Sequence, residues 1–344
     1  MSNVISQTVF VGLDYHAESV QVCVLSREGK MLANQACRND WRVVAAAVRE
    51  KCGPGTEVQA AIESCCGAAD LADELIAQAH WSVDLAHPGY VARIKQSPDK
   101  TDFSDARLLA DLERVGYLPR VWLAPEEVRE LRRLVRYRQS LTKERKNLKL
   151  QIGAALREAR QKPTTELNTW TKAWLAWLTN TAVLSPNARL IVRQRLKRLA
   201  ALATEIRAAE RLLERQTRTD PLVQKLLTLP GIGLVTAVTI RAEIGRFDRF
   251  RTGKQLARFC GLSPRNASSG QKQADAGLIK AGNPQLRTVL VEAAHRLIRY
   301  DERWTKLACQ LRQRGKPVSV TVAAIANRWM RWLFHQMQPG RLAA

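Results

Sequence analysis

Four carboxylates stand where the chain could bind divalent metal ions. Asp14 closes one short apolar run and Glu63 closes another, while Asp102 and Asp105 open a segment with helical periodicity. Acids gathered at one edge of a sheet repel one another unless a cation neutralises them. Two such cations, about 3.5–4 Å apart, can activate a nucleophile and stabilise the leaving oxygen in phosphodiester displacement.

The third and fourth acids share one helical face with two leucines. Asp102 and Asp105 align with Leu109 and Leu112, so the acids continue the stripe that is expected to pack on a sheet. A simpler interpretation is that acids in a first helical turn complement the helix dipole. It accounts for one aspartate, but poorly for two on the packing face. Hard oxygen ligands would select Mg²⁺ or Mn²⁺ over softer metals.

The overall charge indicates a polyanionic partner. The 344 residues include 55 Lys and Arg against 32 acids, giving a formal net charge of +23. This excess favours nucleic acid over a membrane, because no apolar run approaches the roughly 18 residues of a spanning helix.

The beginning of the chain lacks a signal-peptide pattern, and the seven cysteines form no Cys-x-x-Cys pair. Reduced thiols in a cytoplasmic protein are therefore expected.

The first third of the chain alternates between strand and helix patterns. The strands are predicted at Val9–Leu13, Ser19–Leu25, Met31–Ala36, the run ending at Glu63, and Ser82–Ala86, with helices near Val43–Cys52 and Ala68–Ala79. The first three strands look like an antiparallel meander. Meander and β-α-β alternation together predict a mixed sheet covered by helices.

Two long helices with heptad spacing are predicted next. Residues 129–162 carry twelve Lys and Arg against three acids, with Leu134, Leu141 and Leu148 every seven residues. A second helix begins at Ser185-Pro186 and repeats its apolar residues at the same interval. The pair could form a coiled-coil hairpin, mediate dimerisation, or pack as a plain hairpin on its own chain. The tryptophan stripe at 170, 174 and 177 between them is interpreted as core rather than as a base-stacking platform.

The last third of the chain is predicted to be mostly helical. Residues 229–233, Leu-Pro-Gly-Ile-Gly, read as a tight turn between two helices, and further helices are expected over Pro284–Tyr300 and Val318–Met337. The turn resembles a helix-hairpin-helix, in which backbone N–H groups can hold a phosphate without reading sequence.

Several motifs resemble one transposase family. Residues 100–107, Lys-Thr-Asp-Phe-Ser-Asp-Ala-Arg, are similar to the Lys-Thr-Asp-x-x-Asp-Ala motif of the DEDD transposases of the IS110/IS1111 insertion-sequence family, which are bridge-RNA-guided recombinases. Gly12-Leu13-Asp14 resembles the family's Gly-x-Asp, and the strand order looks like an RNase H/RuvC-type domain. Segments 229–233, 259–265 and 269–287 follow the family's second domain in order. Residues 64–67, Ser-Cys-Cys-Gly, depart from the family's usual Ala-Thr-Gly or Ala-Cys-Gly.

The resemblance implies a composite catalytic site. Asp14, Glu63, Asp102 and Asp105 would be the metal-binding tetrad. The nucleophile would be Ser269, a serine just before a glycine, although the adjacent Ser268 leaves this open by one position. A lone serine is a weak nucleophile, so the two domains would have to meet, across subunits, for the metal site to activate it.

The resemblance also implies partners and an assembly. These are donor and target DNA, a noncoding bridge RNA that guides the reaction, and a homodimer that assembles into a tetramer, in the bacterial cytoplasm and at the nucleoid when acting. The residues expected to contact nucleic acid are Arg132, Arg133, Arg136, Lys143, Lys146, Arg265, Lys272, Lys280 and Arg287.

Three domains and two alternative functions follow from these patterns. The domains are a RuvC-like catalytic domain at 1–125, a basic coiled-coil region at 126–218, and a helical domain with the serine at 219–344. One alternative is a RuvC-like, Mg²⁺-dependent, structure-specific endonuclease in which water replaces serine as the nucleophile. The other is a non-catalytic, basic nucleic-acid-binding protein.

Overall fold

The computed structural model describes residues 8–53, 55–95, 101–163, 166–266, 275–279 and 282–338. It divides the chain into two compact units, residues 1–124 and 125–344. No helix in these described ranges is long and apolar enough to cross a membrane. The finer separation of a middle region from a C-terminal domain at residue 218 stays a prediction.

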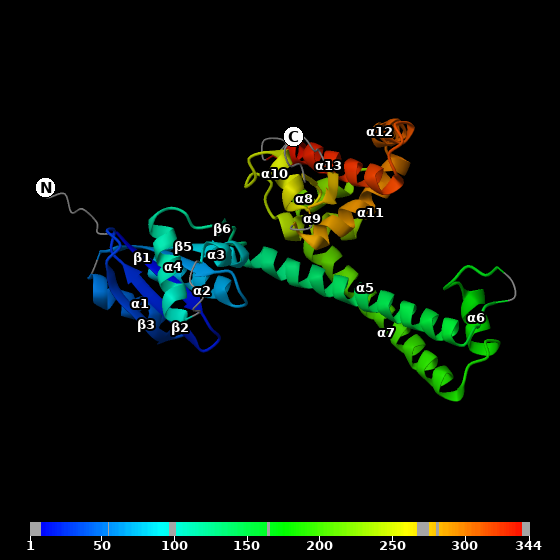
Figure 1. Cartoon of the computed structure of the whole chain (residues 1–344), viewed down its shortest axis with the longest axis horizontal. Helices are drawn as coiled ribbons and strands as arrows, with labels where there is room; N and C mark the ends of the chain where they lie inside the picture. Colours follow the sequence, from blue (N-terminus) through cyan, green and yellow to red (C-terminus); the bar gives the residue numbers. More distant parts are fainter. Residues whose placement is uncertain are drawn as a thin grey trace. The chain divides into compact units, whose positions relative to one another are not determined.

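The first unit is built on a six-stranded mixed sheet (Figure 1). Its strands are β1 (Thr8–Tyr15), β2 (Ser19–Leu25), β3 (Met31–Arg38), β4 (Glu57–Glu63), β5 (Ser82–Ala86) and β6 (Arg120–Val121). Their order across the sheet is β3-β2-β1-β4-β5-β6. The pairs β1–β4 and β4–β5 are parallel and the other pairs are antiparallel, so the predicted meander and mixed sheet are confirmed.

Helices cover both faces of this sheet. Helices α1 (Trp41–Cys52) and α2 (Ala68–Ala79) pack on the side chains of one face, which include Val9 and Val11. The opposite face carries α4 (Asp102–Arg114), while the short helix α3 (Pro88–Ile94) packs near the end of β5. Because side chains alternate along a strand, residues of β1 point in turn to α1 and α2 and then to α4.

Helix α4 crosses β1 almost in backbone contact. A Cβ atom added to Gly12 would lie 1.8 Å from the carbonyl oxygen of Ala106 and 2.6 Å from the amide nitrogen of Ala110. Only glycine permits this approach, because neither neighbouring backbone atom can move away as a flexible side chain can.

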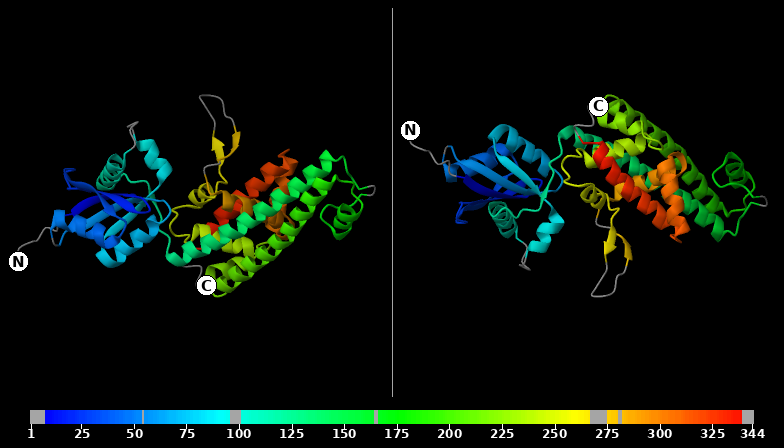
Figure 2. Two further views of the ribbon diagram at one scale, coloured as in Figure 1. Left: turned by 90° about the horizontal axis from the view of Figure 1, so that it is seen from below. Right: turned by 90° about the horizontal axis from the view of Figure 1, so that it is seen from above.

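The second unit begins with a helical hairpin (Figures 1 and 2). Helix α5 (Glu126–Glu158) and helix α7 (Pro186–Thr217) lie antiparallel, joined through the short α6 (Lys172–Asn180). The predicted heptad residues meet one another, with Leu141 and Leu148 packed against Ile206. The ion pair between Arg138 and Glu210 also joins the two helices. The seams are thus buried within one chain, whereas supercoiling and dimerisation stay predictions.

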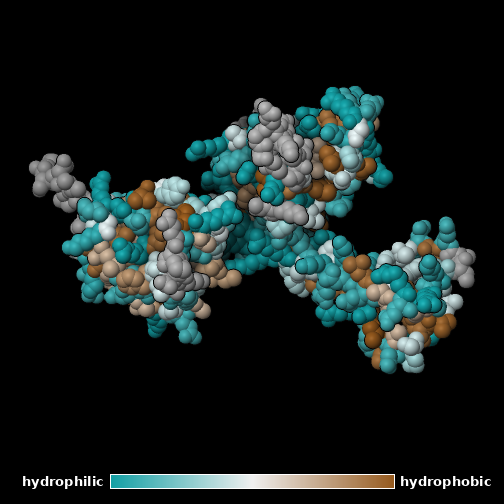
Figure 3. Space-filling model, viewed as in Figure 1, coloured by the Kyte–Doolittle hydropathy of each residue, from teal (hydrophilic) through white to brown (hydrophobic). Residues whose placement is uncertain are grey.

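The tryptophan stripe belongs to the small core at the α6 end of this hairpin. Trp174 is 4% exposed, and the partly buried Trp170 and Trp177 pack on the same cluster. This confirms the interpretation of the stripe as core. Apolar side chains also reach the surface in this region, where brown residues lie among teal ones in Figure 3. Leu190 is 56% exposed.

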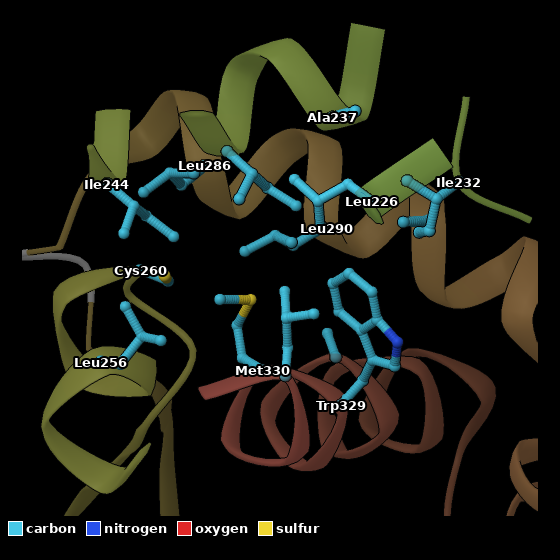
Figure 4. Packing of buried hydrophobic residues seen from close by; sticks show 14 of the residues in the cluster. Leu226, Ile232, Ala237, Ile244, Leu256, Cys260, Leu286, Leu290, Trp329 and Met330 are labelled. Atoms are coloured by element: carbon cyan, nitrogen blue, oxygen red, sulfur yellow. The ribbon is translucent and has the colours of Figure 1, made fainter. Parts of the chain in front are cut away.

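The remaining helices enclose the largest apolar core. They are α8 (Pro221–Leu227), α9 (Leu234–Ile244), α10 (Gly253–Phe259), α11 (Pro284–Tyr300), α12 (Glu302–Gln313) and α13 (Val318–Gln336). Side chains from five of them converge around Leu290 and Met330 (Figure 4). The strands β7 (Pro264–Asn266) and β8 (Asp275–Leu278) form a two-stranded ribbon that stands out from these helices in Figure 2.

Candidate metal site and basic surface

The sheet places two of the four predicted acids at one edge and on one face. Strands β1 and β4 are parallel, with Leu13 opposite Ile62, so Asp14 and Glu63 follow at the carboxyl ends of neighbouring strands. Gly12 lies against α4, and the side chain two residues further along a strand points to the same face. Both acids are therefore presented on the side of the sheet that α4 covers.

Local hydrogen bonds fix where α4 begins. The Thr101 hydroxyl accepts a hydrogen bond from the Ser104 amide at 3.2 Å, and the Ser104 hydroxyl reaches back to the Thr101 backbone. This reciprocal cap starts the helix at Asp102 and puts Asp105 in its first turn. Asp105 is half-buried, and Leu109 and Leu112 continue its face into the core, as the spacing predicts.

An unpredicted histidine lies between two of the acids. His16 Nε2 is 3.6 Å from Asp14 Oδ2 and 3.3 Å from Asp102 Oδ2. One ligand atom from each of these three side chains lies within 4.8 Å of the others, a spacing that one metal ion could bridge. His16 follows β1 directly, and its place beside Asp102 depends on how α4 packs on the sheet, so no periodicity in the sequence could have identified it.

The fourth acid has a cationic partner of its own. The ammonium group of Lys95, at the C-terminal end of α3, forms an ion pair with Asp105 Oδ1. No pattern in the sequence predicts this pair, because it depends on how α3 and α4 pack together. Lys95 and His16 thus occupy places beside the acids where a cation is favourable. The carboxylate oxygens suit a divalent ion such as Mg²⁺ or Mn²⁺, whereas the imidazole nitrogen is a ligand more typical of softer divalent metals.

The segment after Glu63 shapes the rim of the site. Gly67 has φ +91° and precedes α2, and a Cβ atom there would lie 2.1 Å from the Tyr15 hydroxyl oxygen. Burial raises the pKa of the Cys65 thiol, and the negative charges of Glu63 and Asp14 contribute to the same shift. The charges of Glu63 and Asp14 therefore act on the Cys65 sulfur. Because the pKa of the thiol is raised, Cys65 forms the reactive thiolate less readily than an ordinary cysteine.

The predicted nucleic-acid-binding residues have different surroundings. Arg136 donates to both carboxylate oxygens of the buried Glu243, at 2.8 and 2.9 Å, and Arg132 Nε lies 3.7 Å from the same carboxylate. Arg133 forms an ion pair with Glu130 on the helix surface. Lys143, Lys146 and Arg265 are exposed and Arg287 is half-buried. Lys272, Lys280, Ser268 and Ser269 lie outside the described residues.

Comparisons with known proteins match both parts of the chain. A family model described as "Transposase", of the DEDD IS110 type, matches residues 11–160. A second, described as "Transposase IS116/IS110/IS902 family", matches residues 223–309. Together they cover the helix and strands that carry the acid cluster and most of the C-terminal helices.

Curated relatives agree with these models over long stretches. A Pseudomonas aeruginosa protein named "Probable family 20 transposase" is 30% identical over 289 residues, covering 80% of this chain and 82% of that protein. The "Transposase for insertion sequence element IS1111A" of Coxiella burnetii is 24% identical over 333 residues, covering 92% and 86%. These matches define an enzyme of the DNA transposase class. The chain belongs to the IS110/IS1111 family of insertion-sequence transposases.

Proposed function

We propose that this transposase cuts and rejoins DNA at a divalent metal site formed by Asp14, Glu63, Asp102 and Asp105, with His16 at its edge. The convergence of Asp14, His16 and Asp102 carries the proposal, because it brings a strand end and a distant helix together around one possible cation position. The order of the six strands supports an RNase H/RuvC-like assignment for this unit. Mg²⁺ is the expected ion, and Mn²⁺ is expected to substitute for it.

The proposed nucleophile is the hydroxyl group of Ser269. Its oxygen would form a bond to the scissile phosphorus while the bond from phosphorus to one bridging oxygen breaks, giving a phosphoserine linkage. The serine proton leaves to a base, and the departing DNA oxygen takes up a proton. Attack by another DNA hydroxyl would reverse these bond changes and rejoin the strand. A bound divalent ion would supply charge neutralisation at the phosphate.

The proposed partners are donor DNA, target DNA and a noncoding guide RNA. The net charge of +23 supports them, since two nucleic acids require more neutralising surface than one. Base pairing would choose the site while the protein reads backbone and shape. The α5–α7 hairpin, with Lys143 and Lys146 exposed, is the proposed basic surface, and it is the element through which we propose that dimers and then tetramers assemble.

A nicked suicide substrate tests the nucleophile. Wild-type protein should form a covalent protein–DNA adduct in the presence of Mg²⁺, and Ser269→Ala should abolish it. Ser268→Ala serves as the matched control and should retain the adduct. Cleavage by Ser269→Ala, without an adduct in wild type, would instead favour the endonuclease that uses water.

Replacement of an acid tests the metal site. Asp14→Ala should abolish Mg²⁺-dependent cleavage while DNA affinity measured in EDTA stays within about twofold, because the acid contributes to chemistry rather than to phosphate binding. If neither protein breaks DNA in any divalent metal, the non-catalytic binding protein becomes the better interpretation.

Sequencing the RNA that co-purifies with the protein tests whether a noncoding guide RNA is bound.

A further inference from the structure

A chain of polar side chains links the sheet to the first turn of α4. Gln21 Nε2 on β2 donates a hydrogen bond to Asn34 Oδ1 on β3 at 2.7 Å. Asn34 Nδ2 in turn donates to the backbone carbonyl oxygen of Phe103 at 2.9 Å. Gln21 is the cross-strand partner of Asp14, so the chain begins beside one acid and ends between two others.

This link acts at the N-terminal end of the helix, where Lys95 also forms an ion pair with Asp105. Helix α4 is fixed further along by its close approach to Gly12, where the carbonyl of Ala106 meets β1. A rigid helix held at one crossing point can still pivot about it, and a pivot would move its N-terminal turn the most. The bond from Asn34 to Phe103 attaches this end of the helix to β3, one residue after Asp102. A helical carbonyl has a second lone pair with which to accept it.

A second asparagine holds the other side of the acid cluster in the same way. Asn39, which follows β3 directly, donates through Nδ2 to the carbonyl oxygens of His16 and Ala17 at 2.9 and 3.2 Å. The turn that presents His16 and the helix turn that presents Asp102 are therefore both attached to the β3 side of the sheet. The two attachments therefore lie on either side of the cluster that contains Asp14, His16 and Asp102.

We propose that Asn34, oriented by Gln21, is a positioning residue of the metal site and holds Asp102 opposite Asp14. The inference rests on the proposed metal site. Metal ligands must be held within about 0.5 Å of their productive places, and loss of a supporting partner typically costs roughly 10–100-fold in metal affinity or activity. Asn34 does not itself touch the metal position in this account, and it acts only through the backbone of α4.

Two substitutions separate the hydrogen bond from the shape of the side chain. Asn34→Asp keeps the shape but loses the donor to Phe103, and Asn34→Leu removes both hydrogen bonds at similar size. In full-length protein, Mn²⁺ binding followed by electron paramagnetic resonance should weaken about tenfold in both. Gln21→Ala should weaken it less, because Asn34 can still donate. Gln35→Ala, on the next residue of β3 and the opposite face, is the matched control and should bind Mn²⁺ as wild type does.

A second readout excludes a merely structural effect. Cleavage by the Asn34 variants should need about tenfold more Mg²⁺ for half-maximal rate and recover at saturating Mg²⁺, with the thermal midpoint unchanged. If Asp14→Ala abolishes Mn²⁺ binding while both Asn34 variants bind like wild type, the positioning role is wrong. Equal losses in Asn34→Asp and Gln35→Ala would also overturn it. If Asp14→Ala itself leaves Mn²⁺ binding intact, the proposed metal site fails, and the positioning role fails with it.

Discussion

At the scale of single residues, the acid cluster is stabilised by two basic side chains. Lys95 forms an ion pair with Asp105, and His16 lies within 4 Å of both Asp14 and Asp102. Gathered carboxylates raise one another's electrostatic energy, and nearby basic groups lower it. Lys95 would have to release Asp105 for a divalent cation to bind there, so it would compete with the proposed metal ion, whereas His16 would be one of the ligands.

Removal of the Lys95 charge should therefore strengthen metal binding. We expect Lys95→Met to bind Mn²⁺ roughly fivefold more tightly, which corresponds to about 1 kcal/mol for a partly exposed ion pair. Calorimetric titration with Mn²⁺ in the absence of DNA measures the change. Lys51→Met, which removes the partner of Glu50 on α1, is the control and should leave the affinity unchanged. Weaker binding by Lys95→Met would show that Lys95 supports the site rather than competing for it.

The positions of the acids can be predicted from the sequence more readily than the side chains that contact them. Asp14 and Glu63 could each be placed at the end of a strand, because strand alternation is a local rule that acts on short apolar runs. Lys95 could not be paired with Asp105, because that contact depends on the angle between two helices. His16 required knowledge of where the N-terminus of α4 lies above β1, which no periodicity encodes.

At the scale of elements, the close crossing of α4 over β1 determines how near the first turn of α4 lies to the sheet. Gly12→Ala should be strongly destabilising, by about 3 kcal/mol or more, because the new methyl group meets backbone atoms of α4 that cannot relax separately. Chemical denaturation followed by circular dichroism measures the loss. Gly153→Ala in α5 is the contrasting change, since its methyl would meet only the end of the Arg157 side chain at 3.4 Å. It should stabilise by about 0.5–1 kcal/mol, and a loss as large as that of Gly12→Ala would contradict this account.

Long periodic elements are visible in the sequence and short ones are not. The bounds of β2 and α2 match the predicted ranges, and Ser185 caps α7 as expected, with its hydroxyl accepting from the Ala188 amide. The sequence does not reveal helix α12, because Asp301 both ends α11 and caps α12, so no polar linker separates the two helices. The β7–β8 ribbon is not visible in the sequence, because strands of three and four residues carry too little alternation to detect.

Glu243 joins three helices and should be essential to the second unit. Its buried carboxylate receives Arg136 from α5 and, at 2.8 Å, the side-chain amide of Asn283, which caps α11. Glu243→Ala should cost about 3 kcal/mol, at the low end for a broken buried pair because Arg136 remains half-exposed. Urea denaturation measures it. Glu210→Ala, which breaks the partly exposed pair with Arg138, should cost at most about 1 kcal/mol, and equal losses would contradict the ranking.

At the scale of the whole molecule, the positive charge is divided between two tasks. Arg138 is 17% exposed and bound to Glu210, so its charge is used inside the hairpin. Lys143 and Lys146, one and two turns further along α5, are exposed and remain available to a polyanion. Net charge alone therefore overstates the binding surface, and the location of the basic groups within the fold decides which of them can contact phosphate.

This division predicts which substitutions change the salt dependence of DNA binding. The logarithm of duplex affinity should fall with the logarithm of salt concentration by about 0.9 per phosphate contacted. Lys143→Ala and Lys146→Ala should each reduce that slope by about 1, whereas Arg138→Ala should leave it unchanged because its guanidinium is occupied by Glu210. Fluorescence anisotropy with labelled duplex at several salt concentrations, in EDTA to prevent cleavage, gives the slopes. A reduced slope for Arg138→Ala with unchanged slopes for both lysine variants would move the DNA-binding surface to another face of α5.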